Sequence, residues 1–150
     1  MYYLSYQDIA QLYSKVVEVS GGGYVGVIDK GRVEGILEQV KNDFYYPEIE
    51  DKLTYLFYTF AKYHCFADGN KRIALASTIA FLNYNGYVFI LSRFIREMEN
   101  VSIHVASGAI DKPLLHKIIT SIIYEDDFSE ELKMEIAFSL QAFYDSEASR

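Results

Sequence analysis

The sequence predicts an all-α protein, a single domain of about seven helices with one small β-hairpin flap. Three observations lead to this prediction. Apolar residues recur at spacings of three and four along most of the chain, cap residues divide that pattern into segments, and neither a repeat nor a linker interrupts it. With 150 residues, 51% hydrophobic and 16% aromatic, the chain suffices for one core. We therefore expect one domain over residues 1–150, of which about 125–150 form an extra C-terminal helix.

Two amphipathic helices open the chain. Ser5 and Asp8 have the spacing of a capping box, and the apolar stripe that follows them ends near Ser20. Asp29 caps the second helix, and Pro47 marks the break after it. The stripes consist of Ile9, Leu12, Tyr13, Val16 and Val17 in the first helix, and of Val33, Ile36, Leu37 and Val40 in the second.

Between these helices, residues 21–26 read Gly-Gly-Gly-Tyr-Val-Gly and match the dinucleotide-binding pattern GxGxxG. A helix precedes them where that motif needs a strand, so we assign no dinucleotide to them. Val25 and Val27 alternate with small residues, which is typical of a short strand, and a flexible loop is the other interpretation. Just beyond, Arg32 is either a surface arginine or a contact to a phosphate or a partner.

The two central helices have strongly apolar patterns and flank residues 64–72. In the first, His64 continues the apolar stripe as its last member, which places the imidazole at a helix end. The second ends at Asn85 and Gly86, a pair that tolerates a left-handed conformation. The stripe of the first is Leu53, Leu56, Phe57, Phe60 and Ala61, and the second is built on Ile73, Ala74, Ala76, Ile79, Ala80, Phe81 and Leu82.

Three further helices complete the prediction. Residues 87–91 form a short extended or buried connector, and Ser92 can cap the helix after it. Lys112 and Pro113 begin the next helix, and the acidic residues in 125–131 suit the positive end of the last one. That last helix either covers the core or forms an oligomer contact. The apolar positions are Ile95, Met98, Val101 and Val105, then Leu114, Leu115, Ile118, Ile119, Ile122 and Ile123, then Leu132, Ile136, Leu140 and Phe143.

The loop between the central helices points to a function. Backbone N–H groups and the dipole make the start of a helix an anion site that fits a phosphate. Gly69 allows the backbone to approach a ligand closely, and Asn70 can cap the helix or donate to a phosphate oxygen. Lys71 and Arg72 add two cations. Asp68 is placed to hold a Mg²⁺ ion that bridges phosphates.

His64 is the side chain of this loop that can take a proton near neutral pH. Each loop residue also has a plainer interpretation when taken singly, as a structural histidine, a turn or a solvated cation. Cations at a helix start are unfavourable unless an anion is present, so the joint pattern favours a phosphate site. Cys65 is a second candidate nucleophile, but neighbouring helical residues face different ways. His104 and His116 have no ligands at metal-binding spacing, so we assign neither to a metal.

Residues 64–72 read His-Cys-Phe-Ala-Asp-Gly-Asn-Lys-Arg. This stretch resembles the active-site motif of the Fic/Doc family, His-x-Phe-x-(Asp/Glu)-(Gly/Ala)-Asn-x-Arg, at every fixed position. Members that transfer AMP usually have glycine at the position of Lys71 and a second arginine at the position of Leu75. Both departures are similar to the death-on-curing, or Doc, branch, the toxin half of a toxin–antitoxin pair.

The resemblance implies an enzyme that uses ATP and Mg²⁺ to transfer the terminal phosphate to a Ser, Thr or Tyr hydroxyl of a target protein, with His64 as the base. It also implies a separate antitoxin and a target-docking flap, against which the target lies as an added strand. The flap residues are Gly23, Tyr24, Val25, Gly26 and Val27. Two alternatives remain: a Fic-type adenylyltransferase that transfers AMP, and a non-catalytic protein of this fold that only binds a partner.

Composition limits the other possibilities. A formal net charge of −7 argues against a nucleic-acid surface and favours partners that bring basic charge. A single cysteine, Cys65, rules out a disulfide framework. No signal-type N-terminus or long apolar run is present, so we expect a cytoplasmic protein without a membrane association.

Overall fold

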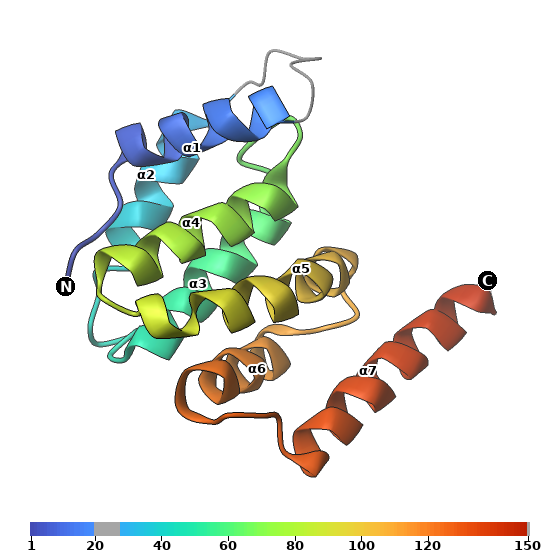
Figure 1. Ribbon diagram of the computed structural model, residues 1–150. Coiled ribbons are helices and arrows are strands. Elements are labelled where there is room, and N and C mark those ends of the chain that lie inside the picture. The colour runs from blue at the N-terminus through green and yellow to red at the C-terminus, as the bar shows by residue number, and fades with distance from the viewer. Residues whose placement is uncertain (20–27, 150) are drawn as a thin grey trace.

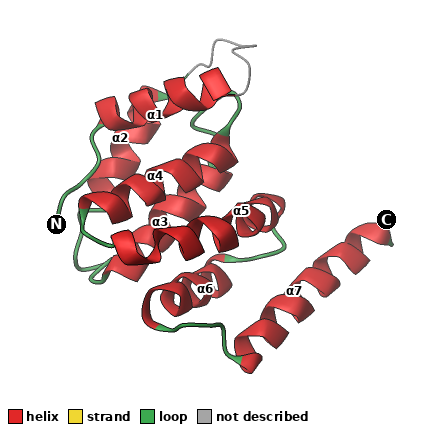
Figure 2. Cartoon of the chain, in the orientation of Figure 1, coloured by secondary structure: helices red, strands yellow, loops and turns green. Residues whose placement is uncertain are grey.

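The computed structural model describes residues 1–19 and 28–149, which form α-helices with one short 3₁₀ helix between them (Figures 1 and 2). In chain order the elements are α1 (Tyr6–Val19), α2 (Lys30–Gln39), α3 (Ile49–Lys62), α4 (Asn70–Tyr84), η1 (Val88–Ile90), α5 (Leu91–Ser107), α6 (Lys112–Tyr124) and α7 (Glu130–Ala148). Within these ranges there is no strand, only an isolated antiparallel bridge between Ile28 and Phe66. The all-α class is therefore confirmed, whereas the flap expected at residues 23–27 lies outside the described residues.

Helix α3 is the centre of the domain, because it packs against α4, α5 and α6 (Figure 1). Leu53, Phe57 and Phe60 on this helix are completely buried, as the apolar stripe predicts. Burying a side chain of this size stabilises a fold by about 1.5–3 kcal/mol. Helix α4 lies against α3 and also contacts α1 and α5, so the connection between α3 and α4 is held at both of its ends by the core.

Side-chain caps fix where several helices begin. Ser5 and Asp8 form the predicted capping box, in which the Ser5 N–H donates to Asp8 Oδ2 (2.8 Å) and the Asp8 N–H to Ser5 Oγ (3.2 Å). Asp29 accepts from the Arg32 N–H (3.1 Å) at the start of α2. Asp111 caps α6, one residue before the predicted start, and Ser129 caps α7.

The segment before α5 differs from the prediction. Residues 88–90 form the 3₁₀ helix η1 and are not extended, and Ser92 lies inside α5 and does not cap it. Only Ile90 of this turn is buried, while Val88 and Phe89 are exposed, so burial follows a period near three and not the two of a strand. On α5 itself Phe94, Met98 and Val105 are completely buried, and Ile95 is half-buried on the flank of the stripe.

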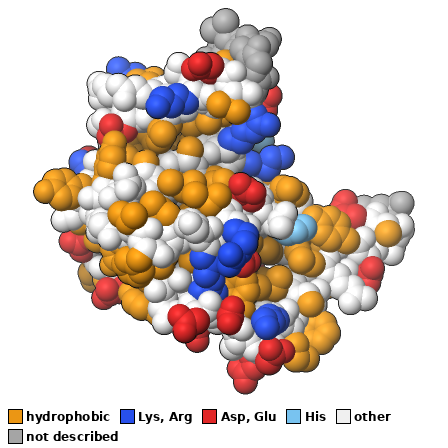
Figure 3. Space-filling model, in the orientation of Figure 1, with side chains coloured by type: hydrophobic (Ala, Val, Ile, Leu, Met, Phe, Trp, Pro, Cys, Tyr) orange, Lys and Arg blue, Asp and Glu red, His pale blue; other side chains and the backbone are white. Residues whose placement is uncertain are grey.

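Helix α7 stands apart from the rest of the domain (Figure 1). Leu132 is its one buried residue among those described, although Ile136 and Leu140 pack partly against the core. The expectation that this helix covers the core therefore holds only on one face. Figure 3 shows acidic side chains interspersed with hydrophobic ones along α7. Across residues 1–19 and 28–149, no helix combines the length and the apolar character that crossing a membrane demands.

Candidate active site

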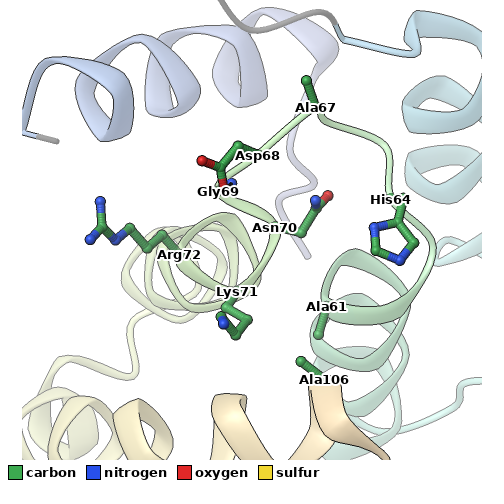
Figure 4. Close-up of a pocket in the computed structure, with 9 residues that line it drawn as sticks. All are labelled: Ala61, His64, Ala67, Asp68, Gly69, Asn70, Lys71, Arg72 and Ala106. Atoms are coloured by element: carbon green, nitrogen blue, oxygen red, sulfur yellow. Dashed lines mark hydrogen bonds between the residues drawn. The ribbon is translucent and has the colours of Figure 1, made fainter. Parts of the chain in front are cut away.

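The loop between α3 and α4 borders a cavity of about 560 Å³ (Figure 4). Its lining includes His64 and each residue from Asp68 to Arg72, so the fold brings together the loop residues that the sequence assigned to the base, the metal and the phosphate site. The size lies within the range of small-molecule sites. Ala67 of the loop also lines the cavity, and sequence reasoning missed two wall residues from outside the loop, Ala61 of α3 and Ala106 of α5. Their small side chains leave space open beside the loop, but an alanine within an apolar helical stripe gives no sign of this.

His64 lies outside the helix that the sequence assigned to it. Helix α3 ends at Lys62, and His64 follows two residues later with a φ of 50°, the one positive φ among the described non-glycine residues. This left-handed residue turns the chain, so that the next two side chains, Cys65 and Phe66, enter the core. The imidazole stays exposed and borders the cavity from the α3 side, opposite the start of α4 (Figure 4).

A left-handed histidine costs conformational energy and persists only where neighbours impose it. For His64, residues at the start of α2 are such neighbours. Arg32 donates from Nη1 to the carbonyl of Tyr63, and the Asp29 N–H donates to the carbonyl of Cys65 (2.7 Å). These bonds hold the peptide group just before His64 and the peptide group that follows Cys65. The sequence suggested a surface or phosphate-binding role for Arg32 and gave no indication of this brace.

Asn70 holds the other half of the loop. Its side-chain amide pairs with the backbone of Phe66, accepting from the N–H (3.2 Å) and donating to the carbonyl (3.0 Å). Because Gly69 takes the N-cap position with a φ of 83°, Asn70 is the first residue of α4 and does not cap it. The predicted cap is wrong. With both amide atoms bonded to Phe66, Asn70 shapes the loop that carries the other site residues.

Positive charge gathers at the start of α4. Lys71 and Arg72 are exposed in its first turn, where there is no acidic side chain. They add to the positive end of the helix dipole. Asp68 is the one carboxylate among the residues that line the cavity, and its Oδ1 accepts from the Gly69 N–H (2.7 Å). The arrangement is suited to a ligand with several negative oxygens.

A metal would have to share its coordination with such a ligand. No cluster of three or more His, Cys, Asp or Glu side chains suited to a metal occurs within the described ranges. Mg²⁺ is nevertheless often held by one or two carboxylates together with phosphate oxygens. Asp68 alone therefore fits Mg²⁺ provided that a phosphate is bound beside it.

Cys65 does not belong to this site. Its side chain is 1% exposed and does not line the cavity. Burial raises the pKa of the thiol to about 11, so the nucleophilic thiolate is scarce near neutral pH. The alternative in which Cys65 acts as the nucleophile is excluded.

Comparison with known proteins agrees with this geometry. The sequence profile of the Fic/DOC family matches residues 3–82. "Protein kinase doc" of Escherichia phage P1 is 39% identical over 93 residues, which cover 59% of this chain and 71% of that protein. "Toxin Doc" of Mycolicibacterium smegmatis is 28% identical over 113 residues, which cover 73% of this chain and 84% of that protein. The profile takes in helices α1 to α3, most of α4 and the whole cavity loop. The chain belongs to the Fic/Doc family.

Proposed function

We propose that this protein is a Doc-like toxin that transfers the terminal phosphate of ATP to a Ser, Thr or Tyr hydroxyl of a target protein. The observation that carries the proposal is the position of His64 across one cavity from the cationic start of α4. A proton acceptor and a phosphate site on opposite walls are what hydroxyl phosphorylation requires. The similarity to proteins named as a kinase and as a toxin supports the same reaction.

The chemistry assigns one role to each wall. His64 accepts the proton of the target hydroxyl, whose oxygen forms a bond to the terminal phosphorus while the bond to the bridging oxygen of ADP breaks. Lys71, Arg72 and the start of α4 neutralise the charge on the phosphate oxygens as ADP leaves. The two contacts from α2 hold His64 in the conformation that faces this reaction.

Asp68 is the residue that would hold Mg²⁺. The ion supplies charge neutralisation to the phosphate chain, in the manner usual for phosphoryl transfer. One oxygen of Asp68 accepts from the Gly69 N–H, which holds the carboxylate beside the start of α4. This assignment depends on a bound nucleotide, because one carboxylate is too few ligands to bind the ion alone.

Lys71 favours phosphate transfer over AMP transfer. AMP transfer needs the α-phosphate close to the acceptor hydroxyl, and a glycine at position 71 would leave room for it. The lysine side chain fills space at the cavity wall and adds charge there. A non-catalytic binding protein would have no need for a strained histidine facing a cationic helix end.

Labelled ATP tests the proposal directly. With label on the terminal phosphate we expect radioactivity in the target protein, and with label on the α-phosphate we expect none. The His64→Ala variant should lower the rate about 10²–10⁴-fold. His104→Ala should keep the rate, because His104 bonds Tyr144 of α7 and does not line the cavity. Transfer of the α-label would establish the adenylyltransferase instead, and transfer of neither label by a folded protein would favour a binding role.

The remaining assignments extend the same proposal. We place the reaction in the cytoplasm, where ATP and an antitoxin protein are at hand. The target would lie along residues 23–27 as an added strand, next to the bridge that joins Ile28 to Phe66. Helix α7 is the candidate contact for a homo-oligomer or another partner.

A further inference from the structure

A second cavity, of about 350 Å³, lies between α6 and α7 and shares no residue with the active-site cavity. Its lining includes three glutamates, Glu125, Glu131 and Glu135, above the buried side chain of Leu132. We call this cavity the α6–α7 groove. Lys117 also lines it, but the ammonium group is already paired with the carboxylate of Glu135, at 2.9 and 3.1 Å. The groove thus retains an excess of negative charge.

The net charge of the chain is concentrated in the segment that forms one wall of this groove. Residues 125–150 contain eight acidic and two basic side chains, a net charge of −6. Residues 1–124 contain thirteen acidic and twelve basic side chains, a net charge of −1. Almost all of the net charge of −7 therefore belongs to α7 and the segment that leads into it. A helix dipole needs only a few acids in its first turn, so capping does not account for this excess.

Ser121 supplies an independent indication that the groove binds something. Ser121 is 2% exposed and lines the groove. Its hydroxyl oxygen, Oγ, has no hydrogen-bond partner among the described residues. Buried hydroxyl groups are nearly always hydrogen-bonded, because leaving one unpaired is costly. An acceptor beside carboxylates is suited to a cationic donor such as an ammonium or guanidinium group.

The adjoining face of α7 offers apolar contacts. Met134 and Phe138 are 55% and 64% exposed. They share a helix face with Glu131 and Glu135, at spacings of three, four and seven residues. Large exposed side chains of this kind are typical anchors at protein interfaces. Figure 3 shows the acidic and hydrophobic side chains side by side on α7.

We propose that the α6–α7 groove and the Met134–Phe138 face of α7 dock a basic amphipathic helix of a partner protein. One lysine or arginine of that helix enters the groove between Glu125 and Glu131 and donates to Ser121 Oγ, and its apolar side chains cover Phe138. A metal does not fit, because the described residues contain no suitable ligand cluster. For this groove a second copy of the chain is a poorer occupant than a basic partner, because it would bring one acidic helix against another.

The test uses the full chain, labelled with ¹⁵N, and a synthetic amphipathic helix of leucine and lysine as the probe. We expect chemical-shift changes confined to α6 and α7 and an affinity that falls as salt is added. The variant Glu125→Lys/Glu131→Lys should weaken binding at least about tenfold. The matched control Glu18→Lys/Glu34→Lys makes the same change in net charge at exposed positions of α1 and α2, and it should weaken binding less than about threefold.

Ser121→Ala separates the specific contact from general attraction. It leaves the charge unchanged and should weaken binding about fivefold, with an unchanged melting temperature. Equal weakening by both charge-reversed variants would overturn the proposal, as would no effect of Ser121→Ala or shift changes that lie outside α6 and α7. Self-association through the same residues without the probe would overturn it in favour of a second copy.

Discussion

At the scale of single residues, the cavity loop owes its shape to side chains that bond the backbone. Arg32 holds the peptide group before His64, and Asn70 holds both polar atoms of the Phe66 backbone. Neither side chain needs to touch a substrate for the site to depend on it. The position of the proposed base is therefore set partly by α2, a helix that contributes no lining residue to the cavity.

We predict that Arg32→Gln lowers kcat for phosphate transfer about 10–100-fold and changes KM for ATP less than about threefold. The substitution removes the guanidinium that donates to the Tyr63 carbonyl, so His64 is free to leave its left-handed conformation, while Lys71 and Arg72 remain intact. Steady-state kinetics measures both constants. Arg96→Gln, at an exposed position of α5, is the control and should have no effect.

Arg32→Lys provides a further comparison, since it keeps the charge and one donor. Its loss in kcat should be smaller than that of Arg32→Gln. A fall in affinity for ATP with an unchanged kcat would show that Arg32 binds a phosphate and does not brace the loop.

We predict that Asn70→Ala lowers the free energy of unfolding by about 1–3 kcal/mol. The substitution leaves the N–H and the carbonyl of Phe66, a 2% exposed residue, without their partner. Chemical denaturation measures the change. Asn83→Ala, at an exposed position of the same helix, is the matched control. If the free energy of unfolding falls equally little in both variants, the pairing of Asn70 with Phe66 makes no measurable contribution to stability.

Local chemistry explains which site residues the sequence could reveal. Residues 64–72 are contiguous, so their charges and the glycine can be recognised without knowledge of the fold. The brace from Arg32 spans 31 residues, and no local pattern encodes it. The end of α3 was also mispredicted, because His64 has the spacing of the apolar stripe but a φ of 50° ends the helix before it.

At the scale of elements, the junction between α6 and α7 depends on one arginine of α5. Arg93 donates from Nη1 to the carbonyls of Ser121, Ile122 and Glu125 at the C-terminal end of α6. Its guanidinium also lies over the ring of Phe128, at 5.2 Å from the centroid. A cation at this position gives the carbonyls at the end of the helix an additional donor and is favourable near the negative end of the helix dipole.

We predict that Arg93→Ala destabilises the protein by about 1–3 kcal/mol, because the carbonyls at the end of α6 lose a charged donor and Phe128 loses its cation. Thermal and chemical denaturation measure the loss, and hydrogen exchange should locate it in the last turn of α6 and in α7. Arg96→Ala, one turn along α5 and 70% exposed in its side chain, is the control. Faster exchange spread evenly over all helices would contradict this assignment.

Helical periodicity predicted every helix, whereas boundaries depended on packing. The caps at Ser5 and Asp29 were recognisable because they act within three residues. The start of α5 was not, because a 3₁₀ turn that buries only Ile90 contains the same apolar residues as a short strand. The limited packing of α7 was equally hidden, since its apolar stripe matches that of a fully packed helix although Leu132 is its one buried residue.

At the scale of the whole molecule, tyrosines join α3 to the segments around it. Lys112 of α6 lies over the rings of Tyr46, Tyr55 and Tyr58, with centroid distances between 5.5 and 5.9 Å. Tyr55 and Tyr46 also pack against each other at 4.6 Å. On the same side of α3, the Tyr124 hydroxyl donates to Glu50 Oε2 (2.9 Å). The Tyr124 bond needs a neutral phenol, because a phenolate has no proton to donate to Glu50, and the burial of Tyr55 opposes the charge of a phenolate there.

We therefore predict that the free energy of unfolding falls as the pH rises from about 10 to 12. Burial raises the pKa of Tyr55 to about 12, and the hydrogen bond to Glu50 raises the pKa of Tyr124 to about 12, from an ordinary value of 10. Between these values the folded protein holds protons that the unfolded chain releases, so the stabilisation is complete below pH 10 and lost above pH 12. Tyr55 should contribute more, because Tyr124 is 60% exposed and solvent screens its bond.

Denaturation at a series of alkaline pH values measures this fall, and absorbance of the phenolate follows the titration itself. Burial raises the pKa of Cys65 to about 11, which adds a loss that begins nearer pH 9. Tyr55→Phe removes the ionisation but keeps the ring, so its stability should decline less steeply between pH 10 and 12 than that of the parent protein. Tyr45→Phe, at a 63% exposed position, is the matched control and should follow the parent curve. Parallel curves for Tyr55→Phe and the parent would mean that Tyr55 ionises as easily in the folded chain as in the unfolded one.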